Sequence, residues 1–278
     1  MQIVLCDDAE QTAREAAKWV QALLVHKTRP VLGLATGSTP IRLYQELIQL
    51  YQQQEISFAN CTTFNLDEYF DIAPAHKQSY RSFMQTQLFN HIDINQQNTH
   101  LPACNQGQNP RLVGLEYEQR IVAAGGIDLQ ILGIGSNGHI GFNEPTSSLA
   151  SRTRLKTLTA QTMSDNSRLF SPDEVQPTMA MTMGIATIMD ARYVLLIATG
   201  LGKAEAVRQM VCGPVSAYCP ASVLQMHEHA IVVLDKAAAS LISDQQYLKV
   251  AEQENQRMIE IYGLQFIVKS YVRGLIAR

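Results

Sequence analysis

Short apolar runs alternate with segments of helical periodicity along almost the whole chain, and this alternation limits the fold more than any other feature. Strand-like runs occupy residues 1–6, 31–35, 61–66, 127–133, 193–199 and 230–234. Helices are expected over residues 9–25, 41–52, 80–89, 112–124 and 203–211, and again from about residue 243. Strands that alternate with helices predict an α/β fold with a mainly parallel sheet and helices on both of its faces.

Composition supports a single globular domain. Apolar residues make up 46% of the 278 residues and charged residues 17%, which is enough to build a large core. No linker rich in Gly, Ser or Pro divides the chain, so we expect one domain over residues 1–278, with a C-terminal helix and tail over about 243–278. The net charge of −3, without a long basic run, argues against nucleic acid or an anionic membrane as the main partner.

The termini and the cysteines indicate a cytoplasmic protein. No apolar run approaches the roughly 20 residues that span a bilayer, and Asp7 and Asp8 come too early for a signal peptide. The five cysteines form no C-x-x-C pair and have no zinc-type spacing with histidine, so we expect free thiols and no metal. Cys212 and Cys219 are near enough in sequence for a redox pair, which is the less frequent arrangement.

A glycine-rich loop over residues 133–145 directly follows one expected strand and carries His139 and Glu144. Its glycines fit the spacing G-x-G-x-x-G, but Pro145 disfavours the helix that a dinucleotide site requires, so we expect no dinucleotide. Loops at the carboxyl ends of parallel strands are where α/β sheets bind ligands. The pair is therefore a candidate catalytic site, while a hydrogen-bonded structural histidine is the alternative.

A second loop, residues 36–40, leads from an expected strand into a helix. Thr39 is expected to cap that helix and Pro40 to occupy its first turn. The backbone N–H groups of Gly37, Ser38 and Thr39 would then face outward at the positive end of the helix dipole, where an anion is stabilised. A phosphate site and a plain helix cap both fit this pattern.

Charged residues mark two further strand ends. Asp67 and Glu68 follow the apolar strand at 61–66, where one of them is expected to be a general base or a helix cap. Lys203 opens a helix, where its charge faces the positive end of the dipole. A bound anion, contacted also by Arg168, would explain the lysine; a solvated surface lysine is the alternative.

Together these loops closely resemble the glucosamine-6-phosphate deaminase (isomerase) family. The specific signatures are Phe64–Tyr69 and Gly138–Pro145, and the resemblance covers nearly the whole chain. It implies a Rossmann-like sheet without dinucleotide and a cofactor-free enzyme. The implied reaction converts glucosamine 6-phosphate and water into fructose 6-phosphate and ammonia.

The resemblance also implies roles for individual residues. Asp67 matches the base that moves a proton between C2 and C1, His139 the ring-opening acid and base, and Glu144 its acidic partner. The substrate phosphate is expected at Gly37, Ser38, Thr39, Arg168 and Lys203. Some members carry aspartate at the position of Asn137; the relay here is expected to depend on Glu144 alone, with the Asn137 amide holding one imidazole tautomer.

A second phosphate site is implied by similarity to the hexameric members. Ser147, Arg154 and Lys156 match residues that bind the allosteric activator N-acetylglucosamine 6-phosphate, and Tyr247 is the candidate for the aromatic that completes this site. We therefore expect a homo-oligomer, with a hexamer favoured. Two other functions fit less well: a 6-phosphogluconolactonase, which shares the G-x-x-G-H loop, and a non-catalytic sugar-phosphate sensor.

Overall fold

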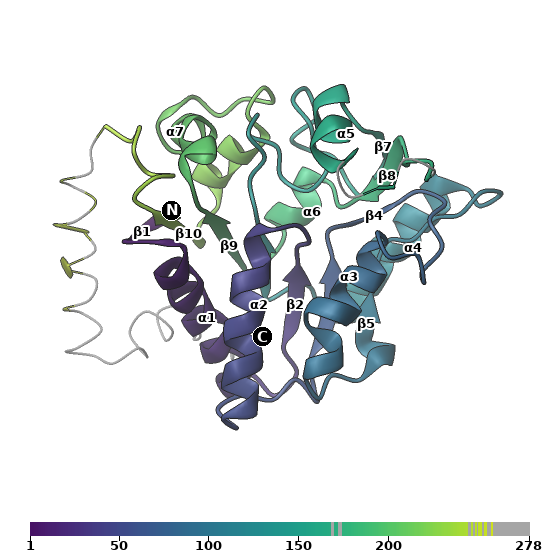
Figure 1. The fold of residues 1–278 in the computed structure, drawn as a ribbon, viewed down its shortest axis with the longest axis horizontal. Helices are drawn as coiled ribbons and strands as arrows, with labels where there is room; N and C mark the ends of the chain where they lie inside the picture. The colour runs from purple at the N-terminus through teal and green to yellow at the C-terminus, as the bar shows by residue number, and fades with distance from the viewer. Residues whose placement is uncertain are drawn as a thin grey trace.

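The computed structural model describes residues 1–167, 170, 171 and 174–243, with scattered positions up to 257. Its centre is a seven-stranded sheet in which all neighbouring strands are parallel (Figure 1). This confirms the predicted α/β class. In their order across the sheet the strands are β1 (Gln2–Cys6), β10 (Ala230–Asp235), β9 (Tyr193–Ala198), β6 (Leu129–Leu132), β2 (Val31–Leu34), β3 (Thr62–Asn65) and β5 (Thr99–His100).

Helices cover the sheet because each parallel crossover must return over one of its faces. The helices α1 (Ala9–His26), α2 (Thr39–Gln52) and α3 (Tyr80–Gln87) lie on one face (Figure 1). With right-handed crossovers, the return from β5 to β6 places α4 (Pro110–Ala123) on the other face. There the ring of Tyr117 packs edge-on against Phe64 of β3. The remaining helices are α5 (Ala160–Ser167), α6 (Ile185–Met189) and α7 (Ala204–Cys212).

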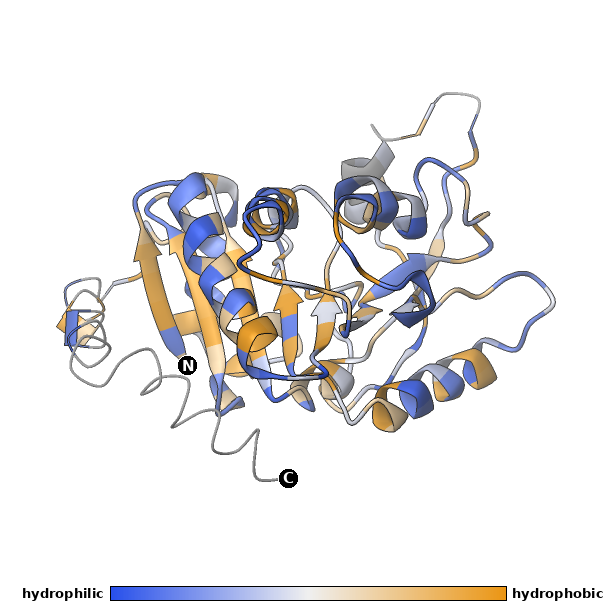
Figure 2. Ribbon diagram, turned by 90° about the horizontal axis from the view of Figure 1, so that it is seen from below, coloured by the Kyte–Doolittle hydropathy of each residue, from blue (hydrophilic) through white to orange (hydrophobic). Residues whose placement is uncertain are grey.

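The core lies between the sheet and these helices. Every residue of β2, β6, β9 and β10 is buried, as expected for strands covered on both faces. Figure 2 shows these strands as mainly hydrophobic and the helices beside them as a mixture of hydrophilic and hydrophobic residues. No helix among the described residues is long and apolar enough to cross a membrane.

A small antiparallel sheet was not predicted. It consists of β4 (Asp67–Tyr69), β8 (Met179–Thr182) and β7 (Arg154–Thr157), with β8 in the middle. The segment directly after residue 66 is therefore a short strand. This second sheet fixes the backbone of Asp67, which lies opposite Thr182 in the register of β4 and β8.

The C-terminal helix expected from about residue 243, the tail that follows it and Tyr247 fall largely or wholly outside the described residues.

Candidate active site

A cavity of about 680 Å³ opens at the carboxyl ends of the parallel strands, the upper edge of the sheet in Figure 1. Four loops or strand ends line it, and each was singled out in the sequence. They contribute residues 36–39 after β2, Asp67 after β3, the glycine loop with His139 after β6, and Lys203 after β9. The strand order brings these distant segments together, because β9, β6, β2 and β3 are consecutive neighbours in the sheet.

His139, Asn137 and Glu144 form one hydrogen-bonded chain in the glycine loop. The Asn137 amide nitrogen donates to Glu144 Oε2 at 2.8 Å, and its oxygen lies 2.7 Å from His139 Nδ1. The direct distance from His139 Nδ1 to Glu144 Oε2 is longer, at 3.4 Å. Asn137 therefore bridges the histidine and the carboxylate, in addition to their longer direct contact.

The orientation of the Asn137 amide also fixes the imidazole tautomer. A carboxylate only accepts hydrogen bonds, so the group facing Glu144 must be the amide NH₂ and the group facing His139 must be the oxygen. His139 Nδ1 then carries the proton and donates it to Asn137. In the neutral imidazole this leaves Nε2 unprotonated and able to accept a proton.

Glu144 is held from both sides. Thr162 Oγ1 donates to its Oε1, while Asn137 occupies its Oε2. Burial alone would raise the pKa of this carboxyl, but the hydrogen bonds from His139, Thr162 and Asn137, and the charge of His139, lower it to about 2. Glu144 is therefore ionised at neutral pH.

Gly135 makes room for the imidazole. A Cβ atom at this position would lie 2.2 Å from Cε1 of His139, well inside van der Waals contact. At Gly133, two residues earlier, a Cβ would meet nothing nearer than Thr39 Cβ at 3.9 Å. Glycine is thus required sterically at 135 and not at 133, so the loop is shaped around the histidine ring.

The adjacent carboxylates Asp67 and Glu68 have separate roles. Glu68 accepts the backbone N–H groups of Tyr69, Tyr80 and Arg81 at 2.9 Å and so caps the start of α3. Asp67 lines the cavity, and its carboxylate forms no hydrogen bond or ion pair with the described residues. Burial, and then the charge of Glu68, raise the pKa of Asp67 well above its usual range. The capping interpretation is therefore realised by Glu68, and Asp67 remains the candidate for the base.

The loop before α2 differs slightly from its prediction. Thr39 is the first helical residue and Ser38 precedes it, without any side-chain capping bond. The N-cap is therefore Ser38 and not Thr39. Gly37 has a φ of +98°, a left-handed conformation that glycine adopts without strain. Within the described part of the chain, no acceptor contacts the N–H groups of Gly37, Ser38 or Thr39, which leaves them available to an anion in the cavity.

Lys203 lies at the junction of a 3₁₀ turn, Leu201–Lys203, and α7, and it reaches the same cavity. Arg168, expected to be the second cation, lies outside the described residues.

Comparison with known proteins identifies the family of this chain. The model of the glucosamine-6-phosphate isomerases/6-phosphogluconolactonase family matches residues 7–233. The chain belongs to this family. The glucosamine-6-phosphate deaminase of Colwellia psychrerythraea (strain 34H) is 64% identical over 264 residues, which cover 95% of this chain and 98% of that protein.

Solved structures agree with this placement in the isomerase/lactonase family. A monomeric glucosamine-6-phosphate deaminase is 41% identical, with a TM-score of 0.83 over 87% of this chain and 100% of that one. The 6-phosphogluconolactonase from Leishmania guyanensis is 21% identical, with a TM-score of 0.65 over 87% of this chain and 98% of that one. The second likeness shows the fold alone.

Several cavity residues of this family member were not predicted from the sequence. Tyr69 and Tyr80 line the side of the cavity next to Asp67, where their ring centroids are 4.9 Å apart. Thr162, which contacts Glu144, comes from α5. The sequence signal for these residues was weak, since aromatic and threonine side chains occur throughout helices and strands.

The expected effector residues lie away from the cavity. Arg154 is on β7 and its guanidinium donates to Asn143 Oδ1 at 2.9 Å, a neutral amide next to Glu144. Ser147 is buried, and its hydroxyl has no hydrogen-bond partner among the described residues. Lys156 is a half-buried residue of the same strand as Arg154. Among the described residues, neither the Ser147 hydroxyl nor the Arg154 guanidinium is bound to a carboxylate.

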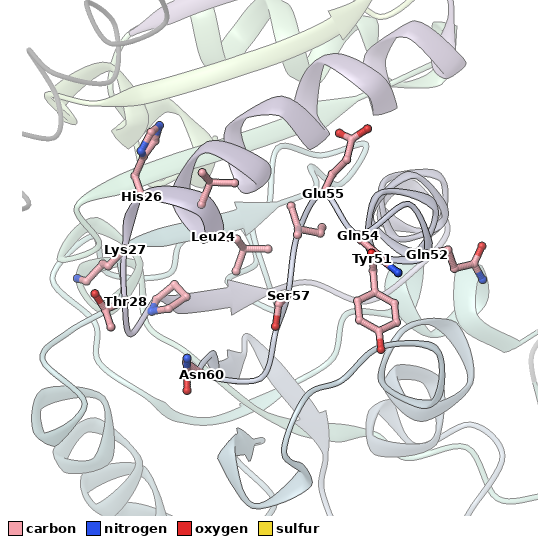
Figure 3. A pocket seen from close by; sticks show the side chains of 13 residues that line it. Leu24, His26, Lys27, Thr28, Tyr51, Gln52, Gln54, Glu55, Ser57 and Asn60 are labelled. Atoms are coloured by element: carbon pink, nitrogen blue, oxygen red, sulfur yellow. The ribbon is translucent and has the colours of Figure 1, made fainter.

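A second cavity, of about 730 Å³, opens at the amino ends of β2 and β3 (Figure 3). Side chains such as His26, Tyr51 and Asn60 line it. It lies at the edge of the sheet opposite Asp67 and His139, away from the switch-point edge where α/β sheets bind ligands. Among the described residues no cluster of His, Cys, Asp and Glu has the arrangement of a metal site.

Proposed function

We propose that this chain converts glucosamine 6-phosphate and water into fructose 6-phosphate and ammonia. The observation that carries the proposal is the pairing, in one cavity, of an unpartnered buried Asp67 with the chain His139–Asn137–Glu144. The first group suits proton abstraction from carbon, and the second suits proton exchange between oxygens. The relatives named glucosamine-6-phosphate deaminase support the same reaction.

Ring opening is assigned to His139. Nε2 takes the proton of the C1 hydroxyl and the proton returns to the ring oxygen as the C1–O5 bond breaks, which leaves an open-chain aldehyde. The imidazolium that forms in between donates from Nδ1 to Asn137, and the ionised Glu144 stabilises its charge through the same amide. A histidine is suited to this task, because its imidazole can both take and return a proton.

Isomerisation and deamination are assigned to Asp67. Its carboxylate takes the proton from C2 of the open-chain amino sugar while a proton passes from the substrate's ammonium group to O1, and the resulting enolamine accepts the C2 proton back at C1. The product is a ketimine at C2, and addition of water releases ammonia and leaves the ketone of fructose 6-phosphate. A raised pKa makes Asp67 a stronger base than an exposed carboxylate.

The phosphate is assigned to the loop before α2, with Arg168 and Lys203 as its cations. The open N–H groups of residues 37–39 lie at the positive end of the α2 dipole. Anchoring the phosphate there places the other end of the sugar toward Asp67 and His139, which line the same cavity.

An ammonia-release assay on glucosamine 6-phosphate tests the proposal, with 6-phosphogluconolactone as the competing substrate. Lactone hydrolysis does not require removal of a proton from carbon, so a lactonase would not need a buried base at position 67. We expect ammonia from the amino sugar and no acceleration of lactone hydrolysis. The opposite result would assign the chain to the lactonase branch of the family.

We further propose a homo-oligomer, with a hexamer favoured, that N-acetylglucosamine 6-phosphate activates at Ser147, Arg154 and Lys156. Support comes from the unpartnered Ser147 hydroxyl and from Arg154, whose guanidinium contacts a neutral amide and no carboxylate. A monomer mass by light scattering, together with hyperbolic kinetics that ignore the effector, would contradict this proposal.

We also propose a single domain located in the cytoplasm. All five cysteines are free, which suits a reducing compartment.

A further inference from the structure

The hydrogen bond between α5 and the glycine loop has a consequence for catalysis. Thr162, in the first turn of α5, donates its hydroxyl proton to Glu144 Oε1. Both residues are buried, with 6% and 3% of their surfaces exposed, so water does not replace this bond readily. In the described part of the chain only Thr159 offers a further hydroxyl to the same oxygen, at 3.3 Å.

Thr159 contributes less because its single proton has another acceptor. Its hydroxyl lies 3.0 Å from Thr162 Oγ1, closer than it lies to Glu144. Thr159 Oγ1 also accepts the backbone N–H of Thr162 at 3.2 Å, as the side chain of a helix N-cap does. Thr159 therefore fixes the start of α5, and Thr162 makes the contact with the carboxylate.

Glu144 is thus oriented by two donors from different parts of the chain. Asn137 holds Oε2 from within the glycine loop, and Thr162 holds Oε1 from α5, 18 residues further along. A carboxylate with both oxygens occupied has one orientation, and here that orientation directs Oε2 to the amide that contacts His139. Loss of the Thr162 bond would let the carboxylate rotate away from this amide.

We propose that Thr162 is a positioning residue of the ring-opening step, acting on His139 through Glu144 and Asn137. The inference rests on the proposed function, since it assigns Glu144 to ring opening. In this proposal Thr162 has a different function from the residues that bind the substrate phosphate. The rate of turnover therefore depends on Thr162 while the affinity for the sugar phosphate does not.

The test uses Thr162→Val, which keeps the shape of the side chain and removes its O–H donor. We expect kcat for ammonia release to fall about 10- to 100-fold, as for loss of one hydrogen bond to a charged group, with KM changed less than about threefold. Thr162→Ser restores the donor and should keep kcat within about threefold of wild type. Thr157→Val, at an exposed position of β7, is the matched control and should leave kcat unchanged.

A double-mutant cycle with Glu144→Gln shows whether Thr162 acts through the carboxylate. If it does, Thr162→Val added to Glu144→Gln should lower kcat less than about threefold further, because the two residues act as one unit. Circular dichroism checks the fold, and Thr162→Ala replaces the valine variant if valine prevents folding.

Three results would overturn the inference while the wild type remains active: an unchanged kcat in Thr162→Val, a loss expressed mainly in KM, or full additivity with Glu144→Gln. A wild-type chain that releases no ammonia from glucosamine 6-phosphate would instead overturn the proposed function, and this inference with it.

Discussion

Replacing Asp67 by asparagine keeps the shape of the side chain and removes its charge. The carboxylate is buried, with 6% of the residue exposed, and it accepts no hydrogen bond from the described residues. Burial and the neighbouring Glu68 raise its pKa well above the usual range, so the ionised form destabilises the folded state. We therefore expect Asp67→Asn to be more stable than the wild type and almost inactive.

The size of the gain follows from the cost of an unpaired buried group. Leaving such a group unsatisfied costs about 1–3 kcal/mol, and more when it is charged. Part of this cost remains for the asparagine amide, so we expect the free energy of unfolding to rise by about 1–3 kcal/mol above the raised pKa. For a chain of this size that is a Tm increase of about 2–10 °C.

The pH dependence gives the sign of the effect. Because the folded-state pKa of Asp67 is raised, the folded wild type binds a proton more tightly than the unfolded chain does. This tighter proton binding stabilises the folded state fully below the ordinary carboxyl pKa of about 4, and the stabilisation is lost as the pH rises through the raised pKa. Asparagine does not titrate, so the Tm difference should be smallest in acid and widest above the raised pKa.

Scanning calorimetry across pH, with ammonia release and solvent-deuterium exchange at C1, measures both halves of the prediction. Turnover should fall at least ~10²-fold, as for loss of a general base. Glu68→Gln is the control of opposite sign, because a glutamine cannot accept all of the backbone N–H groups that Glu68 binds, and it should lower Tm. An Asp67→Asn variant that is no more stable at pH 8, or that retains over about a tenth of wild-type turnover, would refute the reasoning.

Three further predictions test other parts of the molecule. Gly135→Ala places a Cβ 2.2 Å from the imidazole and should lower kcat at least ~10²-fold, whereas Gly133→Ala, whose Cβ has room, should stay within about threefold of wild type. Asn137→Asp places a second carboxylate beside the imidazole and beside Glu144, which the amide now contacts at 2.8 Å. The added negative charge favours the protonated imidazole, so the acidic limb of the pH–rate profile should move to higher pH. An unchanged profile would mean that this side chain does not act on the imidazole. Arg154→Ala combined with Lys156→Ala should abolish a roughly 5- to 150-fold gain in apparent substrate affinity on adding N-acetylglucosamine 6-phosphate, and a retained response would place the effector elsewhere.

Six of the seven strands of the main sheet could be predicted, most clearly the continuous apolar runs Tyr193–Ala198 and Ala230–Asp235, which only a doubly covered sheet buries. The edge strand Thr99–His100 was missed because two residues are too few to form a pattern. The second sheet could not. Its strand Asp67–Tyr69 consists of three residues that begin with two acids, and Arg154–Thr157 carries two cations and is mostly half-exposed. Such strands have neither the length nor the alternation that reveals a strand, and their pairing depends on contacts distant in sequence.

The site was predictable only as far as local patterns reach. The loops after the strands were visible because glycine, charge and strand ends coincide at Gly37, His139 and Lys203. Sequence alone could not show which of Asp67 and Glu68 caps α3, because this depends on which carboxylate the backbone N–H groups of Tyr80 and Arg81 contact in the folded chain. Nor could it pair Thr162 with Glu144, because no periodicity links two positions that meet across a loop and a helix.

Asp67 lines the cavity, and Glu144 contacts His139, which lines it too. The two carboxylates have opposite environments, and the proposed chemistry requires this difference. A base that removes a proton from carbon gains strength from a raised pKa, and the burial of Asp67 without donors supplies one. A partner that stabilises an imidazolium must remain ionised, and the donors around Glu144 hold its pKa at about 2. Exchanging the two environments would leave a weak base at carbon and a protonated carboxyl beside the histidine, so neither step would proceed near neutral pH. In the proposed mechanism, the donors around each carboxylate therefore decide whether it removes a proton, as Asp67 does, or stabilises a positive charge, as Glu144 does.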